Sequence, residues 1–264
     1  MRRLREAAGV TIDQAADRLE CSGSKISRIE TGQTGVTPRD VRDMLAIYEV
    51  DAAYAEVLLQ IAREARQKGW WQLYGDVLTS AYVGLEAAAD RVRAYEALVV
   101  PGLLQAEGYA QAMIQAARPD ISIAEVDKRV RVRMSRRSLI TQDDPLDLWV
   151  VLDEAVLRRP VGGTGVMKLQ LEHLAAVSEL PNVTLQVLPF SAGAHAGMDG
   201  TFTMLLYDES ADQNLVFASN AAGGLFLEKD DELQRYGFIF DYLRAHALRP
   251  AESVSMIVKL LGEP

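Results

Sequence analysis

The sequence predicts a two-part fold: an N-terminal all-α helix-turn-helix bundle, followed by an α/β domain in which helices cover a small mixed sheet. In the first 50 residues, apolar side chains recur every three or four positions, which is the period of amphipathic helices. From residue 146, short strand-like segments alternate with helical ones, and a strand–helix–strand order favours a parallel crossover. A chain of 264 residues can hold two domains, which we expect at 1–68 and 69–264.

Residues 11–32, TIDQAADRLECSGSKISRIETG, have the pattern of two short helices joined by a tight turn. The first helix carries apolar side chains at the spacing i, i+3, i+4, i+7, namely Ile12, Ala15, Ala16 and Leu19. Thr11 is a suitable N-cap because its hydroxyl can accept a hydrogen bond from the first turn. The second helix is expected to begin at Ser22, another N-cap residue, and to end at Gly32.

In the second of these helices, Ile26 and Ile29 are spaced to face the core, which leaves the polar residues outside. A further helix is expected to begin at Thr37, because Pro38 and an acid in the first turn favour helix initiation. Its apolar face comprises Val41, Met44, Leu45 and Tyr48.

The stretch RRLREAAGVTIDQAADRLECSGSKISRIETGQTGVTPRDVRDMLAIYEVD resembles the helix-turn-helix of the Xre (Cro/C1-type) regulators, and SKISRIETG is close to their recognition helix. This resemblance implies that the exposed positions of that helix meet the major groove of double-stranded DNA: Ser22, Ser24, Lys25, Ser27 and Arg28. Arg28 or Lys25 would read guanine edges, and the serines would bond phosphates or bases. Phosphate contacts are expected from four further arginines: Arg2, Arg3, Arg5 and Arg39.

Two features depart from the Xre pattern. Glu20 stands where that family commonly has glycine, and a left-handed backbone there would cost of order 1 kcal/mol for any other residue. The first helix begins abruptly at Met1, so we expect a few residues usual in the family to be missing. An exposed Lys-Ser-Arg face is also compatible with a solvated bundle, and a scaffold that no longer binds DNA remains an alternative.

The charge is unevenly distributed along the chain. The net charge is −9, but residues 1–50 hold eight basic and eight acidic residues, so the acidity belongs to the remainder. We therefore expect modest, salt-sensitive DNA affinity that depends on homodimerisation, since one small domain makes few contacts. Cys21 is the only cysteine, which excludes an intrachain disulfide, and it is expected in the helical core. No apolar run reaches the ~20 residues of a membrane span, and we expect a cytoplasmic protein with no membrane contact.

The middle of the chain is expected to be helical over 51–68, 84–98 and 122–140, and residues 99–116 are expected to begin with a Pro-Gly turn and to continue as a helix. Trp70 and Trp71, at the domain junction, are expected to pack as wedges, with a pocket-lining role as the alternative. Residues 128–139, KRVRVRMSRRSL, are rich in arginine. Since acidic residues flank this run, we favour an ion-paired helix surface over a second nucleic-acid surface.

Four strands are expected in the second domain, at 146–153, 182–190, 201–208 and 214–219. Helices are expected at 166–180, 229–248 and 251–262. Four segments, VVPGLLQAEGYA, DLWVVLDEAVLRRPVGG, LEHLAAVSELPNVTLQVLPFSAGAHAGMDGTFTML and GGLFLE, resemble the domain of unknown function that follows an Xre helix-turn-helix in actinobacterial, WhiJ-like regulators. This resemblance implies a transcription factor, often encoded beside a small acidic partner protein. The family commonly has an acid where Phe217-Ala218-Ser219 stands.

A ligand site is expected in the Gly-rich segment SAGAHAGMDGTF, because loops at strand ends are where α/β proteins place ligands. The candidates for contact with a partner protein or a small-molecule effector are His195, Met198, Asp199, Trp70 and Trp71. The element order is also similar to one half of a phospholipase D-like fold, whose active members need a lysine where Gly197 stands, so a degenerate phosphodiesterase is the alternative function. The histidines lack metal-ligand spacing, and we expect no metal, no cofactor and no enzymatic activity.

Overall fold

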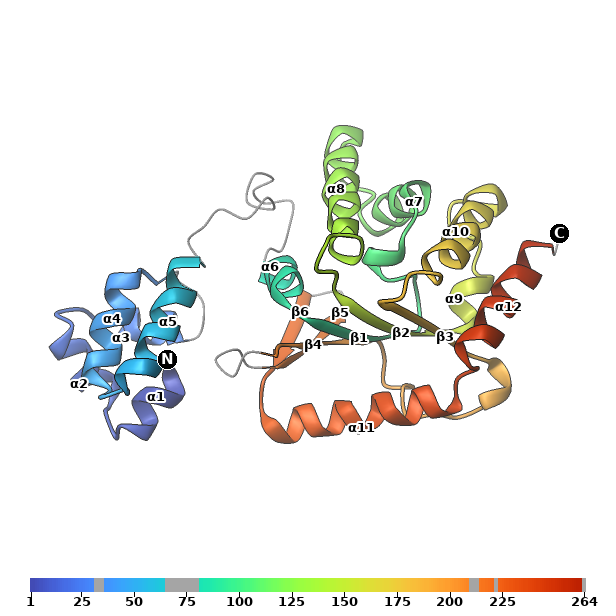
Figure 1. Ribbon diagram of the computed structural model, residues 1–264. Coiled ribbons are helices and arrows are strands. Elements are labelled where there is room, and N and C mark those ends of the chain that lie inside the picture. Colours follow the sequence, from blue (N-terminus) through green and yellow to red (C-terminus); the bar gives the residue numbers. More distant parts are fainter. Residues whose placement is uncertain (31–35, 65–80, 209–213, 221–222, 263–264) are drawn as a thin grey trace. The chain divides into compact units, whose positions relative to one another are not determined.

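Figure 1 shows the computed structural model, which describes residues 1–30, 36–64, 81–208, 214–220 and 223–262. The chain divides into two compact units, Met1–Gly69 and Trp70–Pro264, which are described separately below. The expected boundary at 68/69, Gly32, Trp70 and Trp71 all lie outside the described residues.

The described part of the first unit contains helices only, as predicted. They are α1 (Arg2–Ala7), α2 (Ile12–Arg18), α3 (Gly23–Glu30), α4 (Pro38–Ile47) and α5 (Ala52–Glu64). The predicted caps are confirmed: Thr11 and Thr37 each form a capping box, and the Ser22 hydroxyl accepts a hydrogen bond from the Lys25 amide at 3.2 Å.

The core of this unit is the one that the helical spacing predicts. Its fully buried members come from α2, α3 and α4 and include Ala15, Ala16, Ile26, Met44 and Tyr48. Leu19 and Cys21 pack against it and are partly buried, so the cysteine lies in the core as expected. The other two residues of the predicted face of α4, Val41 and Leu45, pack in a second cluster with Leu59 and Ala62 of α5.

The second unit contains a six-stranded mixed sheet with the strand order β3-β2-β1-β4-β5-β6. The strands are β1 (Arg91–Glu96), β2 (Asp147–Asp153), β3 (Val183–Leu188), β4 (Phe202–Leu206), β5 (Leu215–Asn220) and β6 (Gly223–Leu227). β1, β2 and β3 are parallel, whereas β4, β5 and β6 continue the sheet antiparallel. The parallel pairing of β2 and β3 confirms the crossover expected from the strand–helix–strand order.

Helices cover both faces of the sheet (Figure 1). One face carries α6 (Ala81–Ala88), α7 (Glu107–Ala117), α8 (Ile123–Ser135), α9 (Glu154–Arg158), α10 (Thr164–Val177) and α12 (Pro250–Leu261). The opposite face carries α11 (Asp230–His246). The pleat alternates between the two cores: Val150 packs beneath α10, and its neighbour Val151 packs with Phe240 of α11.

Short 3-10 turns within the described ranges connect these elements: η2 (Gly102–Leu104), η3 (Arg136–Ile140) and η4 (Phe190–Ala192). Among the described residues, no helix is long and apolar enough to cross a membrane.

The predicted helix over 84–98 is wrong. α6 ends at Ala88, and β1 follows as a central strand with β2 on one side and β4 on the other. Val92 and Ala94 face one core while Tyr95 faces the other, so pairing and burial on both sides override the helical propensity of the alanine-rich start. β6 was not predicted, since its residues include two consecutive glycines.

Candidate functional site

The outward face of α3 is polar and exposed, as the predicted recognition helix requires. Ile26 and Ile29 are buried, whereas Ser24, Ser27 and Arg28 lie on the other side of the helix and are exposed. The Arg28 Nε donates a hydrogen bond to the Ser24 carbonyl at 3.3 Å, which holds the side chain along the helix. α3 therefore presents a short, cationic, hydroxyl-bearing surface.

Lys25 is held at one side of this face. Its Nζ lies 3.1 Å from Asp40 Oδ1 on α4, and its side chain is 41% exposed. The Thr37 hydroxyl, and after it Lys25, lower the pKa of the Asp40 carboxyl, which stays ionised. The charge of Lys25 is therefore partly neutralised.

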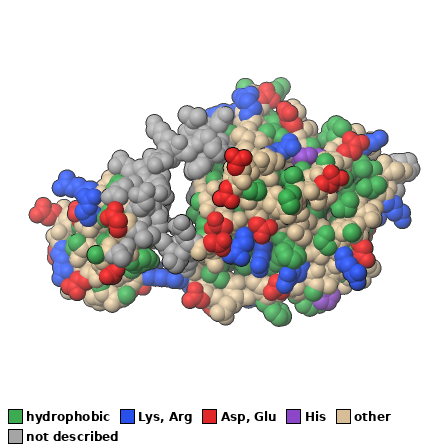
Figure 2. Space-filling view, in the orientation of Figure 1, with side chains coloured by type: hydrophobic (Ala, Val, Ile, Leu, Met, Phe, Trp, Pro, Cys, Tyr) green, Lys and Arg blue, Asp and Glu red, His purple; other side chains and the backbone are tan. Residues whose placement is uncertain are grey.

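The arginines expected at phosphates differ in their surroundings. Arg2, Arg3 and Arg39 are exposed; Arg2 pairs with Glu6 at 2.9 Å, and Arg39 lies 4.0 Å from Asp43. The expectation for Arg5 is wrong, because its guanidinium is buried. It donates to both carboxylate oxygens of Glu30, at 2.8 and 3.0 Å, and to the carbonyl of Val10. Figure 2 shows basic and acidic side chains mixed on the visible face of this unit.

In the second unit, the His195 side chain contacts its own loop and lies near Asp153. Its Nδ1 accepts a hydrogen bond from the Gly197 amide at 3.2 Å, and its Nε2 lies 3.8 Å from Asp153 Oδ2. Asp153 Oδ1 in turn caps α9 by accepting from the Ala155 amide. Burial, and then Asp153, raise the pKa of the neighbouring Tyr95 hydroxyl. These contacts fasten the glycine-rich loop to the end of β2.

The other expected ligand contacts are dispersed. Met198 and Asp199 are exposed, and only Asp199 lines the hollow of about 490 Å³ between the loop and α11. Gly197 lies against Tyr95: a Cβ added there would be 2.5 Å from the ring. The position where active phospholipase D-like proteins carry lysine is therefore closed by an aromatic ring.

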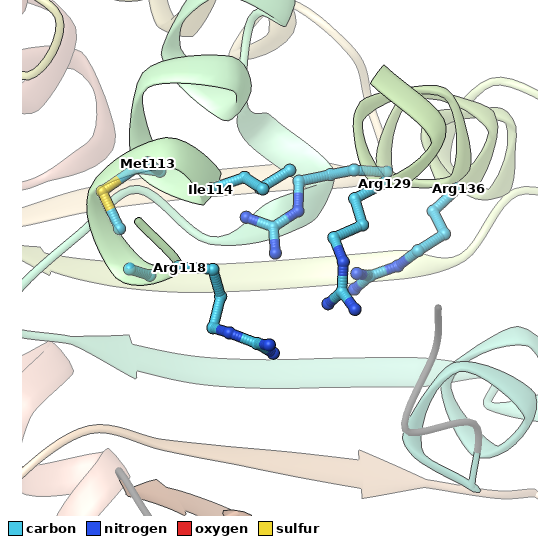
Figure 3. Close-up of a pocket in the computed structure, with 7 residues that line it drawn as sticks. Met113, Ile114, Arg118, Arg129 and Arg136 are labelled. Atoms are coloured by element: carbon cyan, nitrogen blue, oxygen red, sulfur yellow. The ribbon is translucent and has the colours of Figure 1, made fainter. Parts of the chain in front are cut away.

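A more concentrated set of polar groups lies on the opposite face of the sheet, where no site was predicted. Four arginines and three apolar residues line a pocket of about 200 Å³ between α7 and α8: Met113, Ile114, Ala117, Arg118, Arg129, Arg133 and Arg136. Figure 3 shows the labelled arginines extending into the same space. We call this the arginine pocket. The expected ion pairing is confirmed for Arg129 with Glu125, but Arg136 is buried instead of lying on the surface.

A second cavity, of about 180 Å³, adjoins the arginine pocket on the same face of the sheet. Arg133 and Arg136 line both cavities. Glu96 of β1 lines this cavity, and burial raises the pKa of its carboxyl to about 8. At neutral pH this side chain is mostly protonated and can donate a hydrogen bond. Phe217 and Ser219 also line the cavity, at the position where the resemblance leads us to expect an acid.

No group of three or more His, Cys, Asp or Glu side chains that could hold a metal ion occurs within the described ranges. Four arginines of the second unit thus converge at the arginine pocket, and two of them also line the neighbouring cavity.

Comparison with known proteins supports the two-part division. A helix-turn-helix domain matches residues 1–58, and a domain of unknown function (DUF5753) matches residues 79–259. No curated protein and no solved structure matches the chain. The helix-turn-helix indicates DNA binding, while the function of the C-terminal domain is unknown. Since the second match spans more than half of the chain, the protein belongs to the DUF5753 family, with a helix-turn-helix domain at its N-terminal end.

Proposed function

We propose that this protein is a transcription regulator of the Xre type, from the WhiJ-like group, and that it binds its operator as a homodimer. The observation that carries the proposal is the exposed Ser24–Ser27–Arg28 face of α3 within a matched helix-turn-helix domain. Hydroxyl and guanidinium groups at this spacing suit phosphate and guanine contacts in a major groove. Such a regulator would act in the cytoplasm, where it meets the chromosome.

We infer homodimerisation from the charge and the size of the helix-turn-helix domain. Residues 1–50 have no net charge, so a single copy has little non-specific attraction to DNA. Two such domains on adjacent half-sites would multiply the few specific contacts that each can make. We assign dimerisation and sensing of a small ligand or an acidic partner protein to the C-terminal domain.

We also propose that the C-terminal domain is not an enzyme. His195 is engaged with the Gly197 amide and faces Asp153, and the Tyr95 ring occupies the space that a side chain at position 197 would need. These contacts support a structural role for the histidine.

The test is the affinity for the upstream region of the protein's own gene, measured by fluorescence anisotropy for wild type and variants. Arg28→Ala combined with Lys25→Ala should lower specific affinity at least 100-fold, since each base contact is worth about 1–3 kcal/mol.

The matched control removes the same two charges from α8, as Lys128→Ala with Arg131→Ala, and should leave specific affinity unchanged. Circular dichroism should show that all variants are folded. Specific binding that survives in the Lys25/Arg28 variant would refute the role of α3.

A further inference from the structure

The arginine pocket is lined only by guanidinium groups and apolar side chains. Among the described residues that line it there is no Asp or Glu, although four arginines converge there. Met113, Ile114 and Ala117 of α7 form its apolar wall, and the arginines come from α8, η3 and the end of α7. This composition is typical of a site for an anion attached to an organic group.

Three of the four guanidinium groups have carboxylate partners outside the pocket lining. Arg118 pairs with Asp120 at 2.9 Å, Arg129 with Glu125 at 3.1 Å, and Arg136 with Glu86 at 2.8 Å. The hydrogen bond described for Arg133 goes to a neutral acceptor instead, Gln105 Oε1 at 2.9 Å. The positive charge of Arg133 is therefore the least compensated of the four.

The burial of Arg133 makes this imbalance costly. Burial, and then the neighbouring Arg136, lower the pKa of Arg133 to about 10, while the charge of Glu86 raises it, so the group stays charged at neutral pH. A largely buried charge that is only partly balanced is unfavourable in the folded protein. An anion in the pocket would remove that cost, which is a reason for affinity independent of any one hydrogen bond.

The guanidinium groups are also held in place before any ligand arrives. Arg136 makes two hydrogen bonds to Glu86 of α6, and the Tyr82 hydroxyl donates to the same carboxylate. Gln105 is fixed by its own bond to the Val100 carbonyl and so positions Arg133. Pre-ordered donors lose little conformational freedom on binding, which favours affinity.

We infer that the arginine pocket binds a small molecule carrying a multivalent oxyanion, whose oxygens accept hydrogen bonds from Arg118, Arg129 and Arg133. The organic part of that molecule would lie on Met113 and Ile114. A pocket of about 200 Å³ within one domain is far too small for a DNA duplex. As a signal for regulation the inference rests on the proposed function, but the binding event itself does not.

The test is calorimetric titration of the full-length protein with two probes, inorganic pyrophosphate and citrate, at constant ionic strength against sodium chloride. Either probe should bind, and the preferred one tells a phosphate ester from a polycarboxylate. Arg133→Met should weaken binding at least tenfold. Arg131→Met, an exposed arginine on the same helix outside the pocket, should leave it unchanged.

Folding is checked without probe: Arg133→Met should melt no lower than wild type, since it removes a largely buried charge whose described hydrogen bond goes to the neutral Gln105 amide. Equal effects of the two substitutions, or no binding of either probe, would overturn the inference.

DNA affinity, measured separately, keeps the two proposals distinguishable. The Lys25/Arg28 variant should still bind the probe. The Arg133→Met variant should still bind DNA when no probe is present. A wild type that binds DNA and neither probe refutes this inference alone, whereas one that binds a probe and not DNA refutes the proposed function alone.

Discussion

Glu20 and Glu49 occupy left-handed backbone positions, with φ of 49° and 52°. Each directly follows the C-cap residue of a helix, α2 or α4, in the same hydrogen-bonding pattern: the next amide donates a hydrogen bond to the carbonyl of Ala16 or Leu45. Gly9 fills the equivalent position after α1, with φ of 67°. Glycine accepts this conformation without steric cost, whereas glutamate pays of order 1 kcal/mol.

Replacing either glutamate by glycine should therefore stabilise the helix-turn-helix unit. We expect Glu20→Gly and Glu49→Gly each to raise the free energy of unfolding by about 0.5–1 kcal/mol, because the strain removed exceeds the added freedom of the unfolded chain. Amide hydrogen exchange of peptides within residues 1–64 measures this effect for the first unit by itself.

The two variants are matched controls for DNA binding, since both remove one negative charge and one strained residue. Glu20 lies in the turn before α3, so only Glu20→Gly should raise DNA affinity, by a few-fold at low salt. An equal gain for both variants would mean that stability, and not the acid beside the recognition helix, limits binding.

The elements of the first unit are joined by a buried ion pair. The Arg5 guanidinium of α1 holds the Glu30 carboxylate of α3, and their side chains are only 9% and 2% exposed. The hydrogen bonds that Arg5 donates to Glu30 raise the pKa of Arg5 further above its ordinary value. This pair fixes the end of the recognition helix against the first helix, which explains why Arg5 is unavailable to phosphates.

Breaking this pair on one side should cost far more than removing it altogether. We expect Arg5→Met to destabilise the first unit by about 3 kcal/mol, because Glu30 is left as an unpaired buried charge. Hydrogen exchange of α1 and α3 should then accelerate about 100-fold.

The double variant, Arg5→Met with Glu30→Met, should recover most of that stability and retain DNA affinity. Recovered folding with lost DNA affinity would show that Arg5 or Glu30 contacts DNA after all.

Sequence periodicity predicts elements well where local signals agree with the fold. The caps at Thr11, Ser22 and Thr37 and the apolar stripes they precede were read directly from the chain. Failure occurs at β1, where an alanine-rich start favours helix but the central place in the sheet, with partners on both sides, decides the structure. Those partners follow much later in the chain, so no local pattern contains them.

The exposed face of α3 and the arginine pocket also differ in how far the sequence predicts them. The exposed face of α3 depends on positions within a single helix, so spacing alone predicts it. The arginine pocket depends on where Glu86 and Gln105 arrive, 50 residues before Arg136 and 28 before Arg133. The sequence alone predicts the arginine run only as a helix surface. The pocket that these arginines line is formed by tertiary packing, which no local pattern contains.

At the scale of the whole molecule, charge separates the two units. Residues 1–50 are neutral and the remainder carries the full −9. DNA would thus be attracted by the local placement of basic groups on the helix-turn-helix domain, while the acidic C-terminal domain repels it. A neutral DNA-binding domain has little non-specific attraction to DNA, so the proposed regulator would depend on sequence-specific contacts.

The salt dependence of DNA binding can show how many helix-turn-helix domains contact DNA in each complex. Each neutralised phosphate contributes about −0.9 to the slope of log affinity against log salt concentration. Arg39, whose side chain is 89% exposed, is an expected phosphate contact. Arg39→Ala should therefore make the slope shallower by about 1.8 if a dimer binds, but by only about 0.9 if one helix-turn-helix domain binds.

Arg131→Ala, which removes the same charge from the C-terminal domain, should leave the slope unchanged and so controls for net charge. A change near 0.9 would contradict the homodimer while preserving the role of Arg39, since the slope reports contacts for each bound particle. No change at all would remove Arg39 from the interface instead. The magnitude of one slope difference thus separates the stoichiometry of the complex from the identity of its contacts.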